Sequence, residues 1–151
     1  MERNVTSDLS NGWDDVADEF IALRSDTGLD IVSQWIKTLP SGGTVLELGC
    51  GFGAPISMML IERGFDIYGV EPSPKLAAEF KRRLPGASIA CEAAEASAFF
   101  GKPFDAALAI GLIFILAPDV QRSVIKKVED TLKPEGRFLF TAPRKICDWQ
   151  D

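Results

Sequence analysis

The stretch at residues 44–55 reads TVLELGCGFGAP. Its first half is an apolar run, typical of a strand that is covered on both faces in a parallel sheet. Glycines at 49, 51 and 53 then allow positive φ values and let backbone N–H groups approach a ligand closely. Pro55 suits the first turn of a helix, where a missing N–H costs little. We therefore predict a buried strand, a glycine turn and a helix in direct succession.

The acidic residue before the first glycine indicates what this turn binds. Glu47 stands two residues before Gly49, and residues 47–53 read Glu-Leu-Gly-Cys-Gly-Phe-Gly. This segment resembles the first motif of the class I S-adenosylmethionine-dependent methyltransferases, which have a Rossmann-like fold. The resemblance implies S-adenosyl-L-methionine as cofactor, bound by Glu47, Gly49, Cys50, Gly51 and Gly53.

A dinucleotide site is the main alternative, because Gly49, Gly51 and Ala54 also satisfy the pattern Gly-x-Gly-x-x-Gly/Ala. A dinucleotide would place an anionic pyrophosphate at the start of the helix, where Glu47 would repel it. S-adenosylmethionine instead carries an ammonium and a sulfonium, which a carboxylate attracts. Electrostatics therefore favour the methyl donor over NAD(P).

The composition predicts a single domain and argues against nucleic acid as a partner. The chain has 151 residues, of which 46% are hydrophobic, enough for one domain with its own core. Its 16 basic and 22 acidic residues give a net charge of −6, which disfavours a broad phosphate-binding surface. The basic run at 81–83 falls where a helix is expected to end, so we interpret it as a solvated helix terminus.

The chain contains no histidine, and its three cysteines, Cys50, Cys91 and Cys147, are far apart in the sequence. The usual ligands of zinc and the usual parts of a Ser-His-Asp or Cys-His site are therefore missing, and we expect no metal. Unpaired thiols fit a reducing compartment, and the N-terminal residues resemble neither a secretory signal nor a membrane span. We expect a soluble, cytoplasmic protein that does not insert into a membrane.

Strand and helix patterns alternate after the glycine turn. Further strands are predicted at 65–70, 87–91, 104–111 and 138–141, and helices at about 11–23, 26–38, 54–63, 74–84 and 117–132. A tight turn is expected at 133–137. This order predicts an α/β fold with an open, doubly wound, mostly parallel sheet. Its ligand crevice should lie at the carboxyl ends of the strands.

The resemblance to methyltransferases covers residues 12–143 and implies how this single domain, residues 1–151, is divided. Residues 1–40 would form N-terminal helices that close over the cofactor, and residues 44–143 would form the βα core. The family continues beyond the fifth strand with a helix and an antiparallel strand pair, so we expect a C-terminally truncated chain that lacks the last two strands. The exposed edge of the fifth strand is then a candidate surface for a homo-oligomer.

An acidic residue after the second strand is a candidate for binding the cofactor's ribose. Glu71 follows the strand at 65–70 and comes about twenty residues after the first glycine, which is the spacing expected of an acid that accepts from ribose hydroxyls. Pro72 follows directly and belongs to the same candidate site.

The remaining candidate site residues come from the resemblance. In the methyltransferases the loop after the third strand lies beside adenine, often with an acid that accepts from its amino group. This implies Ala94 together with either Glu92 or Glu95. The end of the fourth strand, at Ile110, would border the methyl group and the acceptor. Arg24 is a candidate partner for the donor's carboxylate.

Methyl transfer from a sulfonium needs alignment of nucleophile and methyl carbon more than it needs an acid or base. A chain without histidine can therefore be a methyltransferase, and the sequence identifies no catalytic residue. By elimination we expect a small-molecule acceptor. An NAD(P)-dependent oxidoreductase and a non-catalytic, S-adenosylmethionine-binding subunit remain as alternatives.

Overall fold

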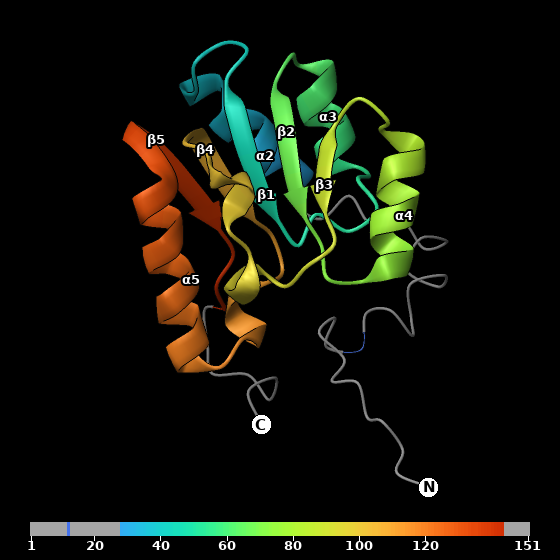
Figure 1. Ribbon diagram of the computed structural model, residues 1–151. Helices are drawn as coiled ribbons and strands as arrows, with labels where there is room; N and C mark the ends of the chain where they lie inside the picture. The colour runs from blue at the N-terminus through green and yellow to red at the C-terminus, as the bar shows by residue number, and fades with distance from the viewer. Residues whose placement is uncertain (1–11, 13–27, 144–151) are drawn as a thin grey trace, which may run out of the picture.

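The computed structural model describes Gly12 and residues 28–143 (Figure 1). Within these residues, five strands form one sheet in the order β3-β2-β1-β4-β5, and each neighbouring pair is parallel. The strands are β1 (Thr44–Leu48), β2 (Asp66–Val70), β3 (Ser88–Ala90), β4 (Phe104–Ala109) and β5 (Leu132–Phe140). The predicted fold class, an open parallel sheet of the Rossmann-like type, is confirmed.

Helices cover both faces of the sheet, as a doubly wound fold requires. They are α2 (Leu29–Trp35), α3 (Ile56–Glu62), α4 (Pro74–Arg83) and α5 (Pro118–Thr131), with 3₁₀ turns η1 (Ile36–Thr38), η2 (Ala94–Ala96), η3 (Phe99–Gly101) and η4 (Ile113–Ile115). Val32 of α2, Leu60 of α3 and Phe80 of α4 belong to one core cluster. Val124 and Val128 of α5 belong to the cluster on the other face.

The central strand β1 is buried on both faces. Val45 packs into the cluster under α2, α3 and α4, whereas Leu46 and Leu48 pack into the cluster under α5. At its amino end, the N–H and the hydroxyl of Thr44 both donate to Asp105 Oδ2, at 2.8 and 3.1 Å. These bonds fix the starts of β1 and β4 beside each other, at the edge of the sheet opposite the glycine turn.

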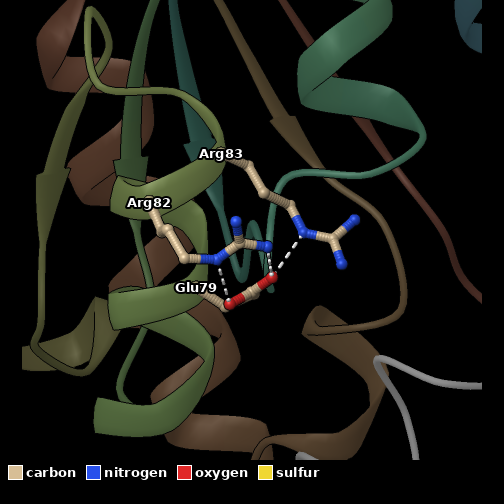
Figure 2. Close-up of polar contacts among 3 residues, drawn as sticks. All are labelled: Glu79, Arg82 and Arg83. Carbon is tan, nitrogen blue, oxygen red and sulfur yellow. Dashed lines mark hydrogen bonds and ion pairs between the residues drawn. The ribbon is translucent and has the colours of Figure 1, made fainter.

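Helix α4 begins and ends as the sequence predicts. Ser73 precedes it, and its Oγ accepts from the N–H of Leu76 at 3.2 Å, while proline occupies the first helical position. The basic run at 81–83 lies in its last turn, where Arg82 and Arg83 both bind Glu79 (Figure 2). Arg83 also lies 4.8 Å from the centroid of the Phe52 ring, so this helix terminus contacts the glycine turn.

The fifth strand begins earlier than predicted. Leu132 pairs with Phe104 and Arg137 pairs with Ala106, so residues 133–136 bulge out from β5 between these two pairs. The turn expected at 133–137 is thus present as a bulge inside a longer strand, with Glu135 at a φ of 67°.

Among the described residues, no helix combines the length and the hydropathy that a membrane span requires.

Candidate functional site

Glu47 near the end of β1 and four loops that leave the carboxyl ends of the strands provide the predicted site residues. The loops are residues 49–55 after β1, 71–73 after β2, 91–97 after β3 and 110–117 after β4. Because the strands are parallel, their carboxyl ends lie at one edge of the sheet. β1 lies between β2 and β4, which is where the winding of the chain reverses. The sequence-predicted residues therefore lie at the carboxyl-end side of the sheet, on both sides of the topological switch point, apart from Arg24, which lies outside the described residues.

The glycine turn makes close backbone contacts that larger residues would prevent. Gly49 has a φ of 67°, and its N–H donates to the carbonyl of Val70 at 2.8 Å. Gly53 has a φ of 88°, and a Cβ at this position would lie 2.7 Å from Leu84 Cδ1 and 3.0 Å from Phe80 Cδ2. The turn therefore packs tightly against α4 and depends on glycine at 53.

Glu47 is a buried carboxylate directly before this turn. It is 5% exposed, and its Oε2 accepts a hydrogen bond from Ser57 Oγ of α3 at 2.5 Å. Burial raises the pKa of Glu47 to about 7, against the opposing effect of the Ser57 hydrogen bond. A nearby cation would stabilise the ionised form of this group. Sequence reasoning missed Ser57, although helical spacing places it on the inner face of α3.

Glu71 is equally buried and joins two backbone segments. Its Oε1 accepts from the N–H of Gly51 at 3.1 Å and its Oε2 accepts from the N–H of Ser73 at 2.8 Å. The carboxylate thereby links the glycine turn to the start of α4. A carboxylate is also the kind of acceptor that ribose hydroxyls require.

Cys50 packs against Gly69 of β2, underneath the turn. Its side chain is buried, and a Cβ on Gly69 of β2 would lie 2.7 Å from its Sγ. Burial raises the pKa of the Cys50 thiol well above its usual value, and the charges of Glu47 and Glu71 raise it further. The thiol is therefore protonated at neutral pH, and nucleophilic catalysis requires the thiolate.

In the loop after β3, the two candidate acids Glu92 and Glu95 have different environments. Glu92 Oε1 accepts from Ser97 Oγ at 2.8 Å, whereas Glu95 is exposed at the surface of η2. Ala94 between them is buried. This arrangement engages Glu92 in the loop itself and favours Glu95 for contact with a ligand.

The loop after β4 has an apolar surface. Residues 106–118 contain no charged, hydroxyl or amide side chain. Ile110 is half-buried, and Leu112 lies over the glycine turn, with its Cβ 3.5 Å from the position of a Cβ on Gly49. The N–H of Gly111 donates to Thr141 Oγ1 at 2.7 Å, which ties this loop to the end of β5. Among the described residues, no group of three or more potential metal ligands is arranged to hold a metal ion.

Comparison with known proteins identifies the family. The profile of the methyltransferase domain matches residues 45–136, which include the glycine turn, β1 from Val45 onward, β2 to β4, and β5 through its bulge. The chain belongs to this methyltransferase domain family. The family expected from residues 47–53 is thereby confirmed.

A relative and two solved structures agree with this assignment. The chain is 35% identical over 95 residues to the 2-methyl-6-phytyl-1,4-hydroquinone methyltransferase of Synechocystis sp., a match that covers 60% of this chain and 30% of that protein. The CcbJ methyltransferase from Streptomyces caelestis superposes with a TM-score of 0.72 at 20% identity, over 88% of this chain and 56% of that one, and supports the fold. The glycopeptide N-methyltransferase MtfA, in complex with S-adenosyl-L-homocysteine, gives a TM-score of 0.63 at 25% identity over 75% and 51% of the two chains. The chain thus spans about half of these structures and less than a third of the Synechocystis relative.

Proposed function

We propose that this chain is the cofactor-binding domain of a class I S-adenosylmethionine-dependent methyltransferase that acts on a small molecule. The observation that carries the proposal is the buried carboxylate of Glu47 beside a glycine turn in a methyltransferase domain. A buried carboxylate at this position attracts a cationic ligand and repels a pyrophosphate. The complex of the related MtfA with S-adenosyl-L-homocysteine supports the same ligand class.

The residues of the site divide the work of holding the cofactor. Glu47 provides the negative charge for the donor's ammonium, directly or through water, and the turn at 49–53 provides a close backbone surface. Glu71 accepts the ribose hydroxyls while Gly51 and Ser73 hold its carboxylate in place. Pro72, Ala94 and Glu95 border the adenosine, and Ile110 borders the methyl group. Arg24 remains the proposed partner of the donor's carboxylate.

The chemistry asks for alignment and exclusion of water. S-adenosylmethionine, when bound, supplies a methyl group activated by its sulfonium. The leaving group is a neutral thioether, which needs no proton. Ile110 and Leu112 form an apolar wall beside the turn, which keeps the reacting atoms away from water. Orientation of this kind contributes on the order of 7 kcal/mol in favourable model reactions.

The apolar loop after β4 also bears on the acceptor. Because residues 106–118 offer no polar side chain, we propose an acceptor that presents an apolar face to this wall and whose nucleophilic atom needs no base from it. The methyltransferase acting on a phytyl-substituted hydroquinone is a relative with this kind of acceptor.

Titration calorimetry tests the cofactor assignment directly. S-adenosylmethionine and S-adenosylhomocysteine should bind, and NAD⁺ and NADP⁺ should not. The reverse selectivity would identify a nucleotide-dependent oxidoreductase and overturn the proposal. A methylation assay with radiolabelled donor, using pairs of hydroquinones with and without an alkyl chain, then tests the acceptor class.

We further propose that residues 44–143 form the core of a single cytoplasmic domain, that residues 1–40 close over the cofactor and that the free edge of β5 supports a homo-oligomer. β5 lies at the end of the strand order and Phe140 on it is 39% exposed, which supports an interaction there. Light scattering after gel filtration measures the oligomeric state. A monomer at all concentrations would refute that part of the proposal.

A further inference from the structure

Lys127 of α5 is a charged side chain that plays no part in the site described so far. Its Nζ donates to the carbonyl oxygen of Ala94 at 2.6 Å and to that of Ser97 at 2.7 Å. The same ammonium lies 4.4 Å from the centroid of the Phe99 ring. A single cation on α5 therefore holds both ends of the η2 turn.

The segment that Lys127 contacts is cross-linked internally as well. Ser97 Oγ donates to Glu92 Oε1 at 2.8 Å and accepts from the N–H of Phe99 at 3.1 Å. Ala94 and Phe99 are buried in the core under α5. Residues 92–99 thus form a compact unit that is attached to α5 through the shared apolar core and through the ammonium of Lys127.

The location of this unit connects it to the cofactor site. Ala90, the last residue of β3, pairs with Val70 of β2, and its carbonyl accepts from the N–H of Glu71 at 3.0 Å. The loop that leads to η2 therefore starts beside the residue proposed to bind the ribose. A base attached to that ribose is within reach of this loop.

We propose that Lys127 is a positioning residue, which fixes η2 so that Ala94 and Glu95 face the adenine of the bound cofactor. This inference rests on the proposed function. Lysine suits the role because an ammonium has three donors and can bind two carbonyls at once. Burial lowers the pKa of Lys127, and the charges of Glu95 and Glu92 oppose that shift.

Binding measurements on Lys127→Met test the proposal, because methionine has similar length and no donor. Calorimetry should show that the Kd for S-adenosylhomocysteine rises about tenfold, since two bonds to a charged donor are lost. Discrimination against S-inosylhomocysteine, whose base carries a carbonyl in place of the amino group, should fall by at least about threefold, because recognition of the base is what the turn provides. Lys127→Arg keeps the charge and several donors and should restore both values.

Lys126→Met is the matched control. Lys126 lies next to Lys127 on α5, is exposed and pairs with Asp130 at 3.0 Å, away from η2. Its replacement should leave ligand affinity and base discrimination unchanged.

The outcomes separate the two proposals. If the wild-type protein binds neither S-adenosylmethionine nor S-adenosylhomocysteine, the proposed function itself fails. If the wild type binds and Lys127→Met retains its affinity and its discrimination, the positioning role is overturned while the function stands. Should the methionine variant not fold, Lys127→Gln, which keeps a neutral donor, takes its place with the same expected direction.

Discussion

Replacing Glu47 by glutamine should stabilise the protein at alkaline pH and change little at acid pH. The pKa of Glu47 is raised from 4.5 to about 7 by burial, so the folded state binds a proton more tightly than the unfolded state does. Between these two values the folded state holds more protons, and stability therefore falls as the pH rises. Glutamine has no proton to lose and can still accept from Ser57 Oγ, so it removes this dependence.

The size of the effect follows from the shift. A shift from 4.5 to about 7 corresponds to about 3 kcal/mol of lost stability once the pH exceeds both values, at 1.36 kcal/mol per unit. Urea unfolding at pH 5 and pH 8.5 should therefore show the wild type losing about 2 to 3 kcal/mol more than Glu47→Gln across this range. Glu62→Gln is the control, because Glu62 lies exposed on α3.

If the free energy of unfolding changes with pH in the same way for the wild type and for Glu47→Gln, ionisation of Glu47 does not destabilise the fold and the reasoning is refuted.

The titration of Glu47 should also affect ligand binding. A cationic ligand lowers the pKa of this carboxylate, so S-adenosylmethionine should bind more tightly as the pH rises from 6 to 8 and should release a proton on binding. Both effects should disappear in Glu47→Gln, and their persistence would place the cation elsewhere.

Three further predictions concern the turn, the bulge and the ribose site. Gly53→Ala should lower the free energy of unfolding, measured in urea, by about 2 kcal/mol or more, because the new Cβ would meet Leu84. Gly64→Ala is the control and should lower it less, because Gly64 has a similar φ but open space around it. Glu135→Gly should increase the free energy of unfolding by about 0.5–1 kcal/mol and thereby raise the melting temperature, because glycine adopts a φ of 67° without strain. Glu135→Ala should give no such gain. Glu71→Ala should raise the calorimetric Kd for S-adenosylhomocysteine at least about tenfold, and an unchanged Kd would remove the ribose assignment.

Much of the fold could be predicted because its signals are local. Three signals each depend on only a few neighbouring residues. The apolar run before the glycines predicts a buried strand, the Ser73-Pro74 pair predicts the start of α4, and the acid at 71 marks the end of β2. The start of β5 was predicted wrongly because the turn signal at 133–136 is the same for a loop and for a bulge. Pairing of Leu132 with Phe104 decides between them, and that contact is not local in the sequence.

The missed site residues are missed for the same reason. Ser57 is a common polar residue in a helix, and it becomes informative only when β1 places Glu47 against that face of α3. Lys127 lies 33 positions from Ala94 and belongs to a helix with one other lysine, so nothing in its own neighbourhood distinguishes it from Lys126. A polar side chain that crosses from one element to another leaves no periodic pattern, whereas an apolar face does.

Two buried acids beside the glycine turn, Glu47 and Glu71, repel each other when both are ionised, and this arrangement suits a cationic methyl donor. Glu47 and Glu71 are both buried, and both raise the pKa of Cys50, so the potential between them is negative. An anionic pyrophosphate entering this potential would meet repulsion from two carboxylates. A sulfonium or ammonium instead relieves the repulsion, and the free energy lost by burying Glu47 is partly recovered on binding. The ligand should therefore raise the melting temperature more at pH 8 than at pH 6, where Glu47 is largely protonated, and an equal rise at both would contradict this reasoning.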